Sequence, residues 1–209
     1  MDPLDPLVRR AQAGDERALH ELFVRHRQDV ARIVFRALGP DGDVDDVVQD
    51  AFIQIFRSIG RFRGNSKFST WLYRVVTNVA RMHLRSRRAR PQIASGVAPE
   101  DAKPASLADG PEQEAERHAR LRALYRQLDQ LSEKKRTVLV LHDFEGLSPA
   151  EIGEIVEAPV LTVRTRLFYA RKELYAALAT DPVLAEVAEQ VREAASGGAN
   201  AGKRAGSEP

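Results

Sequence analysis

The 209-residue sequence contains no cysteine. The chain therefore cannot form a disulfide or supply a thiolate to a metal ion, and such a composition is typical of a reducing compartment. The sequence also lacks a signal peptide and any apolar run of roughly 18 residues, the length that a membrane-spanning helix needs. We therefore expect a cytoplasmic protein.

Acidic residues are missing from one long stretch, residues 51–99, which carries ten basic side chains: Arg57, Arg61, Arg63, Lys67, Arg74, Arg81, Arg85, Arg87, Arg88 and Arg90. Conversely, no Lys or Arg lies between Arg36 and Arg57, where the aspartates are Asp41, Asp43, Asp45, Asp46 and Asp50. The formal net charge of +2 hides this segregation. We expect one surface to attract polyanions and its neighbour to meet a basic protein.

The sequence has no alternating apolar pattern long enough for a sheet, and its apolar residues recur at the spacing of three and four that helices use. This spacing predicts an all-α fold. The expected helices are residues 5–13, Asp15 to Leu38, one from Asp43 or Asp45 onward, 68–88, 119–129, one capped by Ser132, and two between residues 148 and 178. Residues 60–67 form a loop by their composition.

Residues 91–118 are rich in Ala, Pro, Gly and acidic side chains and contain few large apolar ones. Such a segment cannot bury enough surface to offset the entropy lost on ordering, which predicts a flexible linker. It separates two small helical domains, residues 1–90 and 119–179. The polar, glycine-rich end of the chain predicts a disordered tail over residues 180–209.

Residues 147–178 have the pattern of a helical hairpin. Ser148, Pro149 and Glu151 are spaced as a capping box that starts a helix, which Pro159 ends. The next helix places apolar residues on one face and Arg164, Thr165, Phe168 and Lys172 on the other. A helix of this kind can enter and read a DNA major groove. The simpler alternative is an amphipathic hairpin with a solvated basic face.

Three segments resemble, in the same order, motifs of the sigma-70 family of transcription initiation factors. Asp45–Phe52 (DDVVQDAF) resembles the core-binding motif of the family's second region. Phe62–Arg74 (FRGNSKFSTWLYR) resembles the segment that melts the promoter and reads its −10 element. Leu147–Arg171 resembles the fourth-region helix-turn-helix, which reads the −35 element. A two-domain chain of this length is similar to the extracytoplasmic-function (ECF) subgroup.

The resemblance implies three sets of site residues and no catalytic residue. The set for core polymerase is Asp45, Asp46, Gln49, Asp50 and Ile53. The set for −10 binding and melting is Arg61, Phe62, Arg63, Gly64, Asn65, Ser66, Lys67, Phe68, Arg74, Asn78 and Arg81. The set for −35 binding is Arg164, Thr165, Phe168, Tyr169 and Lys172.

In the family, one −10 base is flipped into a pocket, and the matching positions are Phe62, the 64–68 loop and Asn78. Plain core packing is the alternative role for Phe62, and Trp71 is expected in the core or at the rim of the domain. Two positions differ from relatives: Tyr169 stands where arginine is common, and Leu161 where the turn often has glycine. The −35 sequence preference therefore stays open.

The implied partners are the coiled coil of the polymerase's largest subunit, the polymerase flap (through the fourth region), promoter DNA and an anti-sigma factor. No cofactor, metal, small-molecule substrate or membrane insertion is expected. An enzyme is disfavoured because no histidine pair has a metal-ligand spacing and residues 60–67 lack the order of a phosphate loop. A helix-turn-helix operator-binding regulator that works without polymerase is the alternative, but it would leave the acid-free stretch without a role.

Overall fold

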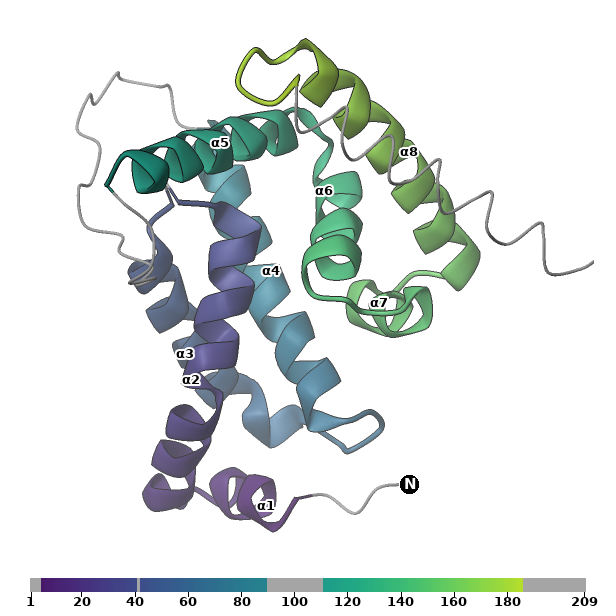
Figure 1. Ribbon diagram of the computed structural model, residues 1–209. Helices are drawn as coiled ribbons and strands as arrows, with labels where there is room; N and C mark the ends of the chain where they lie inside the picture. Colours follow the sequence, from purple (N-terminus) through teal and green to yellow (C-terminus); the bar gives the residue numbers. More distant parts are fainter. Residues whose placement is uncertain (1–4, 41, 90–110, 186–209) are drawn as a thin grey trace, which may run out of the picture.

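The computed structural model describes residues 5–40, 42–89 and 111–185, and none of these lies in a strand (Figure 1). The elements are α1 Pro6–Gln12, α2 Glu16–Leu38, α3 Val44–Ser58, the 3₁₀ turn η1 Ile59–Arg61, α4 Phe68–Ala89, α5 Pro111–Gln130, α6 Glu133–Leu139, the π-helical turn η2 Val140–Phe144, α7 Pro149–Val156 and α8 Val160–Thr180. The expected all-α fold is confirmed. None of the helices in the described ranges combines the length and apolar composition that a membrane crossing requires.

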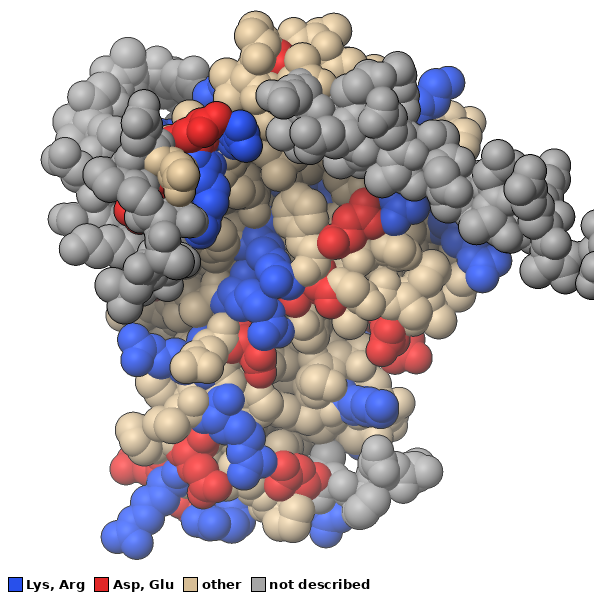
Figure 2. All heavy atoms as spheres, viewed as in Figure 1, with Lys and Arg blue, Asp and Glu red and all other residues tan. Residues whose placement is uncertain are grey.

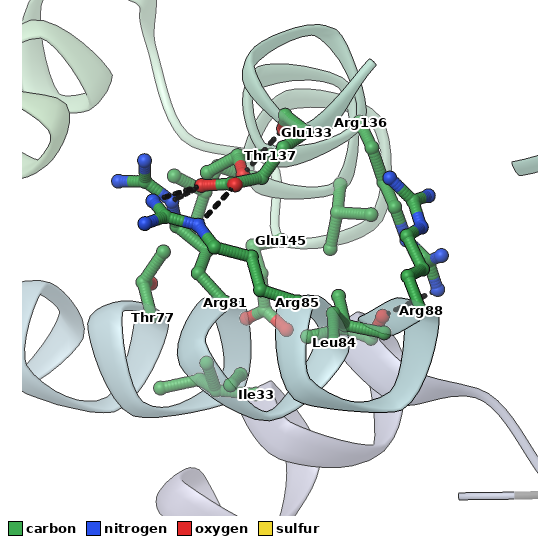
Figure 3. A pocket seen from close by; sticks show the side chains of 14 residues that line it. Ile33, Thr77, Arg81, Leu84, Arg85, Arg88, Glu133, Arg136, Thr137 and Glu145 are labelled. Atoms are coloured by element: carbon green, nitrogen blue, oxygen red, sulfur yellow. Dashed lines mark hydrogen bonds and ion pairs between the residues drawn. The ribbon is translucent and has the colours of Figure 1, made fainter. Parts of the chain in front are cut away.

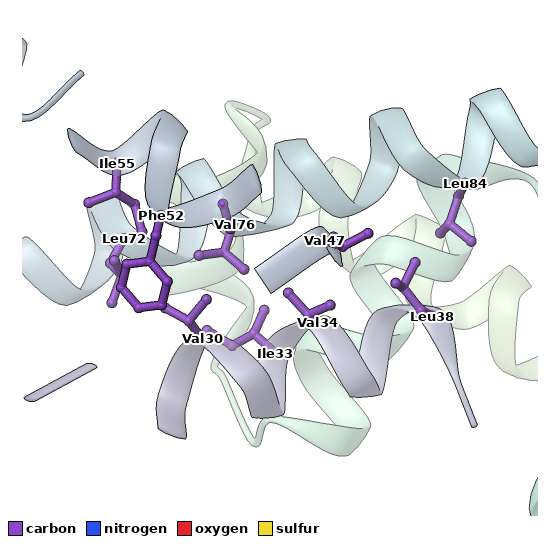
Figure 4. Packing of buried hydrophobic residues seen from close by; sticks show 11 residues of the cluster. Val30, Ile33, Val34, Leu38, Val47, Phe52, Ile55, Leu72, Val76 and Leu84 are labelled. Carbon is purple, nitrogen blue, oxygen red and sulfur yellow. The ribbon is translucent and has the colours of Figure 1, made fainter. Parts of the chain in front are cut away.

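Helices α2, α3 and α4 form an N-terminal unit in which each packs on the other two. Their apolar faces meet in one core (Figure 4), whose buried residues are Val30, Ile33, Val34, Leu38, Val47, Ala51, Phe52, Ile55, Leu72, Val76 and Leu84. Burial of this apolar surface stabilises the unit. The short α1 closes one end, where the side-chain amide of Gln12 donates to the carbonyls of Ile59 (3.0 Å) and Phe62 (2.7 Å).

Helices α5 to α8 form a C-terminal unit that is organised around α8, which packs on the other three. The upper cluster consists of Ala123, Tyr125, Leu128, Leu131, Leu139, Ala170, Leu174, Leu178 and Leu184. The lower cluster consists of Val138, Leu141, Ile152, Ile155, Val163 and Leu167. Because α8 contributes to both clusters, its rotation about its own axis is determined, and the opposite face is left to solvent.

The boundaries of the C-terminal unit differ from the expected ones at both ends. Helix α5 starts at Pro111, so residues 111–118 are helical and not part of a linker. Their glutamates, glutamine, alanine and arginine are strong helix formers, and Glu116 pairs with Arg120 one turn on (2.6 Å). The expected tail begins with ordered residues, because Leu184 is buried in the upper cluster. The remaining linker and tail residues, 90–110 and 186–209, lie outside the described residues.

Three local features of the C-terminal unit were not predicted. Helix α6 continues into the π-helical turn η2. Helix α7 ends at Val156, before Pro159 is reached, because the next residue, Glu157, adopts the left-handed conformation (φ 53°). Ser132 stands at the N-cap of α6 but makes no side-chain capping bond, whereas Ser148 and Glu151 form the full capping box expected at α7.

The two units pack against each other (Figure 1). Helix α4 lies on α6 and α7, and α2 lies on η2. At one end of this contact the ring of Tyr125 lies against the backbone of Gly39, where a Cβ atom would come within 2.5 Å of the ring. Gly39 also has a φ of 90°, so any other residue there would be strained and would clash.

The two serine N-caps supply a matched test of the C-terminal unit. We expect Ser148→Ala to lower the free energy of unfolding by about 1 kcal/mol, because a helix N–H loses its acceptor. Ser132→Ala should change it little, since that hydroxyl caps nothing. Urea unfolding followed by circular dichroism measures both. Equal effects of the two substitutions would contradict the assigned cap geometry.

Candidate nucleic-acid interface

The first candidate surface is the outer face of α3. Asp45, Asp46, Gln49, Asp50 and Ile53 are all exposed there, and the first two stand in the first turn. Carboxylates in a first turn are stabilised by the helix dipole, while Val47, Ala51 and Ile55 hold the opposite face in the core. The structure therefore brings all five residues predicted for polymerase binding onto one solvent-facing side.

The second candidate surface begins beside this face, with a groove between α3 and α4, and includes the loop before α4. Its lining includes Asp50, Ile53, Gln54 and Arg57 from α3, and Arg74, Asn78, Arg81, Met82 and Arg85 from α4. Met82 is 68% exposed and Ile53 is 39% exposed, so the groove combines apolar contacts with charge. Sequence reasoning missed Met82. The only signal in the sequence is that Met82 is a large apolar residue outside the set of positions that α4 buries.

The loop before α4 is held from beneath by an aromatic cluster. The ring of Phe62 is only 7% exposed, with centroids 5.6 Å from Phe68 and 5.4 Å from Trp71. Phe62 thus has the packing role that the sequence left open as its alternative, and Trp71 joins the core edge as expected. Arg61, Arg63, Asn65 and Lys67 are the exposed side chains of this segment, Gly64 turns the chain with a φ of 73°, and Ser66 and Phe68 are half-buried.

Asn78, the α4 residue predicted for the flipped base, lines the α3–α4 groove together with Arg61 and Trp71. Its side chain is exposed. It lies ten residues beyond Phe68, roughly 15 Å along the helix at ~1.5 Å per residue. The groove thus joins Asn78 to Arg61, at the start of the loop segment, whereas residues 62–68 are not among those that line it.

The third candidate surface is the outer face of α8. Arg164, Thr165, Phe168, Tyr169 and Lys172 are all exposed, as predicted. The rings of Phe168 and Tyr169 meet edge to face, with centroids 5.3 Å apart. Apolar and aromatic groups of this kind can contact thymine methyls, and a guanidinium can bind guanine.

The turn before α8 sets the angle at which this face is presented. Gly153 of α7 lies against the carbonyl of Ala158, which would be 2.8 Å from a Cβ atom at that position. Farther along α8, Arg171 Nε donates to Asp143 of η2 (3.0 Å). Arg171 therefore holds α8 against η2.

All five arginines of α4 contact the C-terminal unit. Figure 3 shows Arg81 and Arg85 reaching one carboxylate, Glu133, at the start of α6, with Nε–O distances of 2.5 Å for both. Arg74 donates to the carbonyl of Glu154 (2.6 Å) and pairs with Glu157 (3.1 Å). Arg87 pairs with Asp129 (3.1 Å), and Arg88 donates to the backbone carbonyl of Asp129 (2.7 Å).

The charge of Glu133 depends on these contacts. Hydrogen bonds from Arg85 lower the pKa of Glu133 to about 2; partial burial opposes this shift, and Arg81 adds to it. Behind the ion pairs lies a cavity of about 30 Å³ between α2, α4, α6 and η2, room for about one water molecule. Its lining combines apolar side chains, such as Ile33, Leu84 and Leu141, with the charged groups of the seam.

A second group of contacts joins α2 to the C-terminal unit, where basic and acidic side chains meet in the middle of the face in Figure 2. The carboxylate of Glu145 is almost fully buried and pairs with Arg32 (3.3 Å) and Arg36 (3.1 Å). The hydroxyl of Tyr73 on α4 also donates to it (2.9 Å).

Arg136 of α6 is itself buried and donates to the carbonyl of Ala37 (2.7 Å). The hydroxyl of Tyr125 donates to the carbonyl of Arg36 (3.0 Å), and burial raises the pKa of that tyrosine to about 12. The seam between the units is therefore rich in hydrogen bonds to charged groups, which are the stronger kind.

Each of the two units matches a known protein family. Residues 22–90 match the family Sigma-70 region 2, and residues 121–174 match Sigma-70, region 4. The chain is 39% identical to the RNA polymerase sigma-H factor of Pseudomonas aeruginosa, over 86% of this chain and 95% of that protein. It is 38% identical to the ECF RNA polymerase sigma-E factor of Escherichia coli K12, over 80% and 90% of the two chains. Among solved structures, that of CnrH in complex with the cytosolic domain of CnrY has a TM-score of 0.59 and 27% identity, and it covers 84% of this chain and 96% of that one.

The seam should respond to acid. The pKa of Glu133 in the folded protein lies below its ordinary value of 4.5, so its ion pairs contribute fully above that pH and are lost as the pH falls toward about 2. We expect the ¹³C signal of the Glu133 carboxyl group to titrate near pH 2, and nearer 4.5 in Arg85→Gln. The control Arg120→Gln, which removes only the exposed pair with Glu116, should not move this midpoint. A wild-type midpoint of 4.5 would show that the pairs do not form in solution.

Proposed function

Because this chain belongs to the sigma-70 family of transcription initiation factors, in its ECF subgroup, we propose that its three exposed faces divide the work of initiation. The protein is not an enzyme; it binds core RNA polymerase and directs transcription from specific promoters. A polymerase-independent operator-binding regulator is not favoured, because the N-terminal unit matches a sigma region as well as the C-terminal one. The N-terminal unit acts as region 2, and the C-terminal unit, which starts at Pro111 and includes Leu184, acts as region 4.

The outer face of α3 docks on core polymerase. The observation that carries this assignment is the concentration of Asp45, Asp46, Gln49 and Asp50 on one exposed face with no basic side chain on it. Such a face complements a basic partner surface, and the neighbouring Ile53 and Met82 supply the apolar contact that charge alone does not. The partner element is the coiled coil of the polymerase's largest subunit, and region 4 contacts the polymerase flap.

The loop 61–67 and the basic face of α4 hold the opened −10 strand. Exposed Arg63, Asn65 and Lys67 surround the loop, and Arg74 and Arg81 continue the basic track along α4. Guanidinium and ammonium groups position phosphates, while Asn78 offers a donor and an acceptor to a base edge. Phe62 supports the loop from the core and does not itself stack on a base.

The outer face of α8 reads the −35 element as duplex DNA in the major groove. Arg164 and Thr165 lie near the start of this helix, where a recognition helix contacts base edges. Tyr169 and the exposed Leu161 give this chain a more apolar reading face than arginine and glycine would.

The protein works in the cytoplasm, where polymerase and promoter are found, and an anti-sigma factor restrains it. The second part of this proposal is supported by the solved complex of CnrH with CnrY, since that protein has the same fold over both units. No cofactor is needed for any of these roles.

Docking is tested by charge reversal on α3. We expect Asp46→Lys combined with Gln49→Ala to abolish association with core polymerase, because both side chains are exposed and contribute nothing to the core. Glu21→Lys, a reversal at an exposed carboxylate of α2, is the matched control and should bind normally. A pull-down on purified core enzyme, with helicity checked by circular dichroism, decides the matter. Normal retention of the double variant would refute the docking face.

The two DNA-reading surfaces should fail at different steps. We expect Arg164→Ala to cost about 1–3 kcal/mol of closed-complex affinity, the price of one lost base contact. Asn78→Ala should bind the closed promoter nearly normally but melt it poorly, because its contact exists only after the strands separate. A mobility-shift titration with holoenzyme and a permanganate footprint of unpaired thymines measure the two steps. If Asn78→Ala melts normally but binds weakly, α4 reads duplex DNA.

A further inference from the structure

The outer face of α8 carries a continuous apolar strip. Leu161 is 75% exposed, Phe168 is 64% exposed and Tyr169 is 49% exposed. With Thr165 between them, these residues follow one another at spacings of three and four, so they line one side of the helix. The opposite side of α8 packs in the two C-terminal clusters. A contiguous exposed patch of this kind marks a site of interaction, whereas single exposed apolar residues do not.

The polar groups of the strip offer little to a base edge. The hydroxyl of Thr165 donates to the backbone carbonyl of Leu161 (2.9 Å), so its only hydrogen is used within the helix. The edge-to-face contact of Phe168 with Tyr169, at a centroid distance of 5.3 Å, holds both rings in place. Of these four side chains, only Tyr169 has a hydrogen left to donate. The strip therefore presents mainly hydrocarbon surface to whatever binds it.

One feature of the major groove matches such a surface. Thymine is the base whose major-groove edge carries an apolar group, its C5-methyl, beside the donors and acceptors that the other bases also show. Leu161 and Tyr169 stand eight residues apart on α8, roughly 12 Å at ~1.5 Å per residue. At ~3.4 Å per base pair, a helix lying along the groove covers about three to four pairs with this strip.

The charges beside the strip favour DNA over a protein surface as its occupant. Arg164 and Lys172 are exposed and lie within one turn of Phe168. With Arg171 they line a groove next to that ring, and none of the described residues that line this groove is acidic. An apolar strip with a basic border suits one duplex, which presents base edges in its groove and phosphates along the rim.

Resting on the role proposed above for α8, we propose that Leu161 and Tyr169 are specificity-determining residues, which select thymines of the −35 element by contact with their methyl groups. Phe168 supports the ring of Tyr169, and Thr165 continues the apolar surface between the two. The −35 element of this chain contains two or more thymines beside the base or phosphate that Arg164 binds. An arginine in place of Tyr169 would favour guanine instead, because a guanidinium binds its O6 and N7 atoms.

The first experiment identifies the element and tests its methyl groups. Holoenzyme assembled from the full chain and core polymerase selects bound duplexes from a library of random sequence. Each thymine of the selected −35 element is then replaced by deoxyuridine, which lacks only the methyl group. We expect this change to weaken binding about fourfold at two or more thymines, the effect of one buried methyl group. Deoxyuridine between the −35 and −10 elements is the control and should change nothing. Unchanged affinity at every −35 thymine would overturn the proposal.

The second experiment assigns each methyl group to a side chain. Leu161→Ala and Tyr169→Ala should each lose the preference for thymine over deoxyuridine at one position, and the two positions should differ. Tyr169→Phe should keep the preference, because it keeps the ring. Val24→Ala removes an apolar side chain that is 61% exposed on α2 and should also keep it. Each result is a ratio of two affinities of one protein, so a general loss of stability does not imitate it. Wild-type preferences in both alanine variants of α8 would overturn the assignment.

A gain of specificity completes the test. Holoenzyme with Tyr169→Arg should select guanine where the wild type selects one of its thymines, and its remaining −35 preferences should stay. Selection of the unchanged wild-type element by this variant would show that residue 169 does not read a base.

The measurements separate this inference from the function on which it rests. If selection returns no −35 element and Arg164→Ala binds the closed promoter normally, α8 does not read DNA and both proposals are wrong. If selection returns an element that depends on Arg164 while thymine and deoxyuridine bind alike, only the reading of methyl groups is wrong, and the apolar strip contacts a protein instead.

Discussion

The structure depends on one electrostatic constraint: the arginines of α4 have no acidic partner on their own helix or in the chain from Ala51 to its start. A guanidinium is charged at every physiological pH, so this face must meet water or find anions elsewhere. In the structure the anions come from the C-terminal unit, chiefly through Glu133. In the proposed promoter complex they come from DNA phosphates. A helix with one such face can serve either set of contacts, but not both at once.

Each unit has its own apolar core, while the seam between the units is polar. Helix α4 buries Leu72, Val76 and Leu84 in the N-terminal core, and α8 buries Val163, Leu167 and Leu174 in the two C-terminal clusters. Well-packed interiors resist deformation. The seam between the units, by contrast, consists of ion pairs and hydrogen bonds, some of them exposed, as at Arg85, and some buried, as at Glu145.

Much of the fold could be predicted because its determinants are local. The apolar period predicted α2 and α4 almost to the residue, and the capping box of Ser148 and Glu151 predicted the start of α7. One error overlooked a local signal: residues 111–118 look like linker by composition, yet their strong helix formers extend α5. Another came from a distant contact, because Leu184 is ordered by burial in a core built by other helices. The π-helical turn η2 has no local signature at all.

The sequence by itself determined the elements, the residues on each exposed face and the family, because helical period, caps and charge are properties of neighbouring residues. Only the tertiary structure decided that Phe62 supports its loop from within, that Asn78 lies in the α3–α4 groove, and that the arginines of α4 have partners on the C-terminal unit. Those facts depend on which surfaces meet across the chain. The sequence around an exposed arginine does not show whether its anionic partner is a DNA phosphate or a glutamate from another helix.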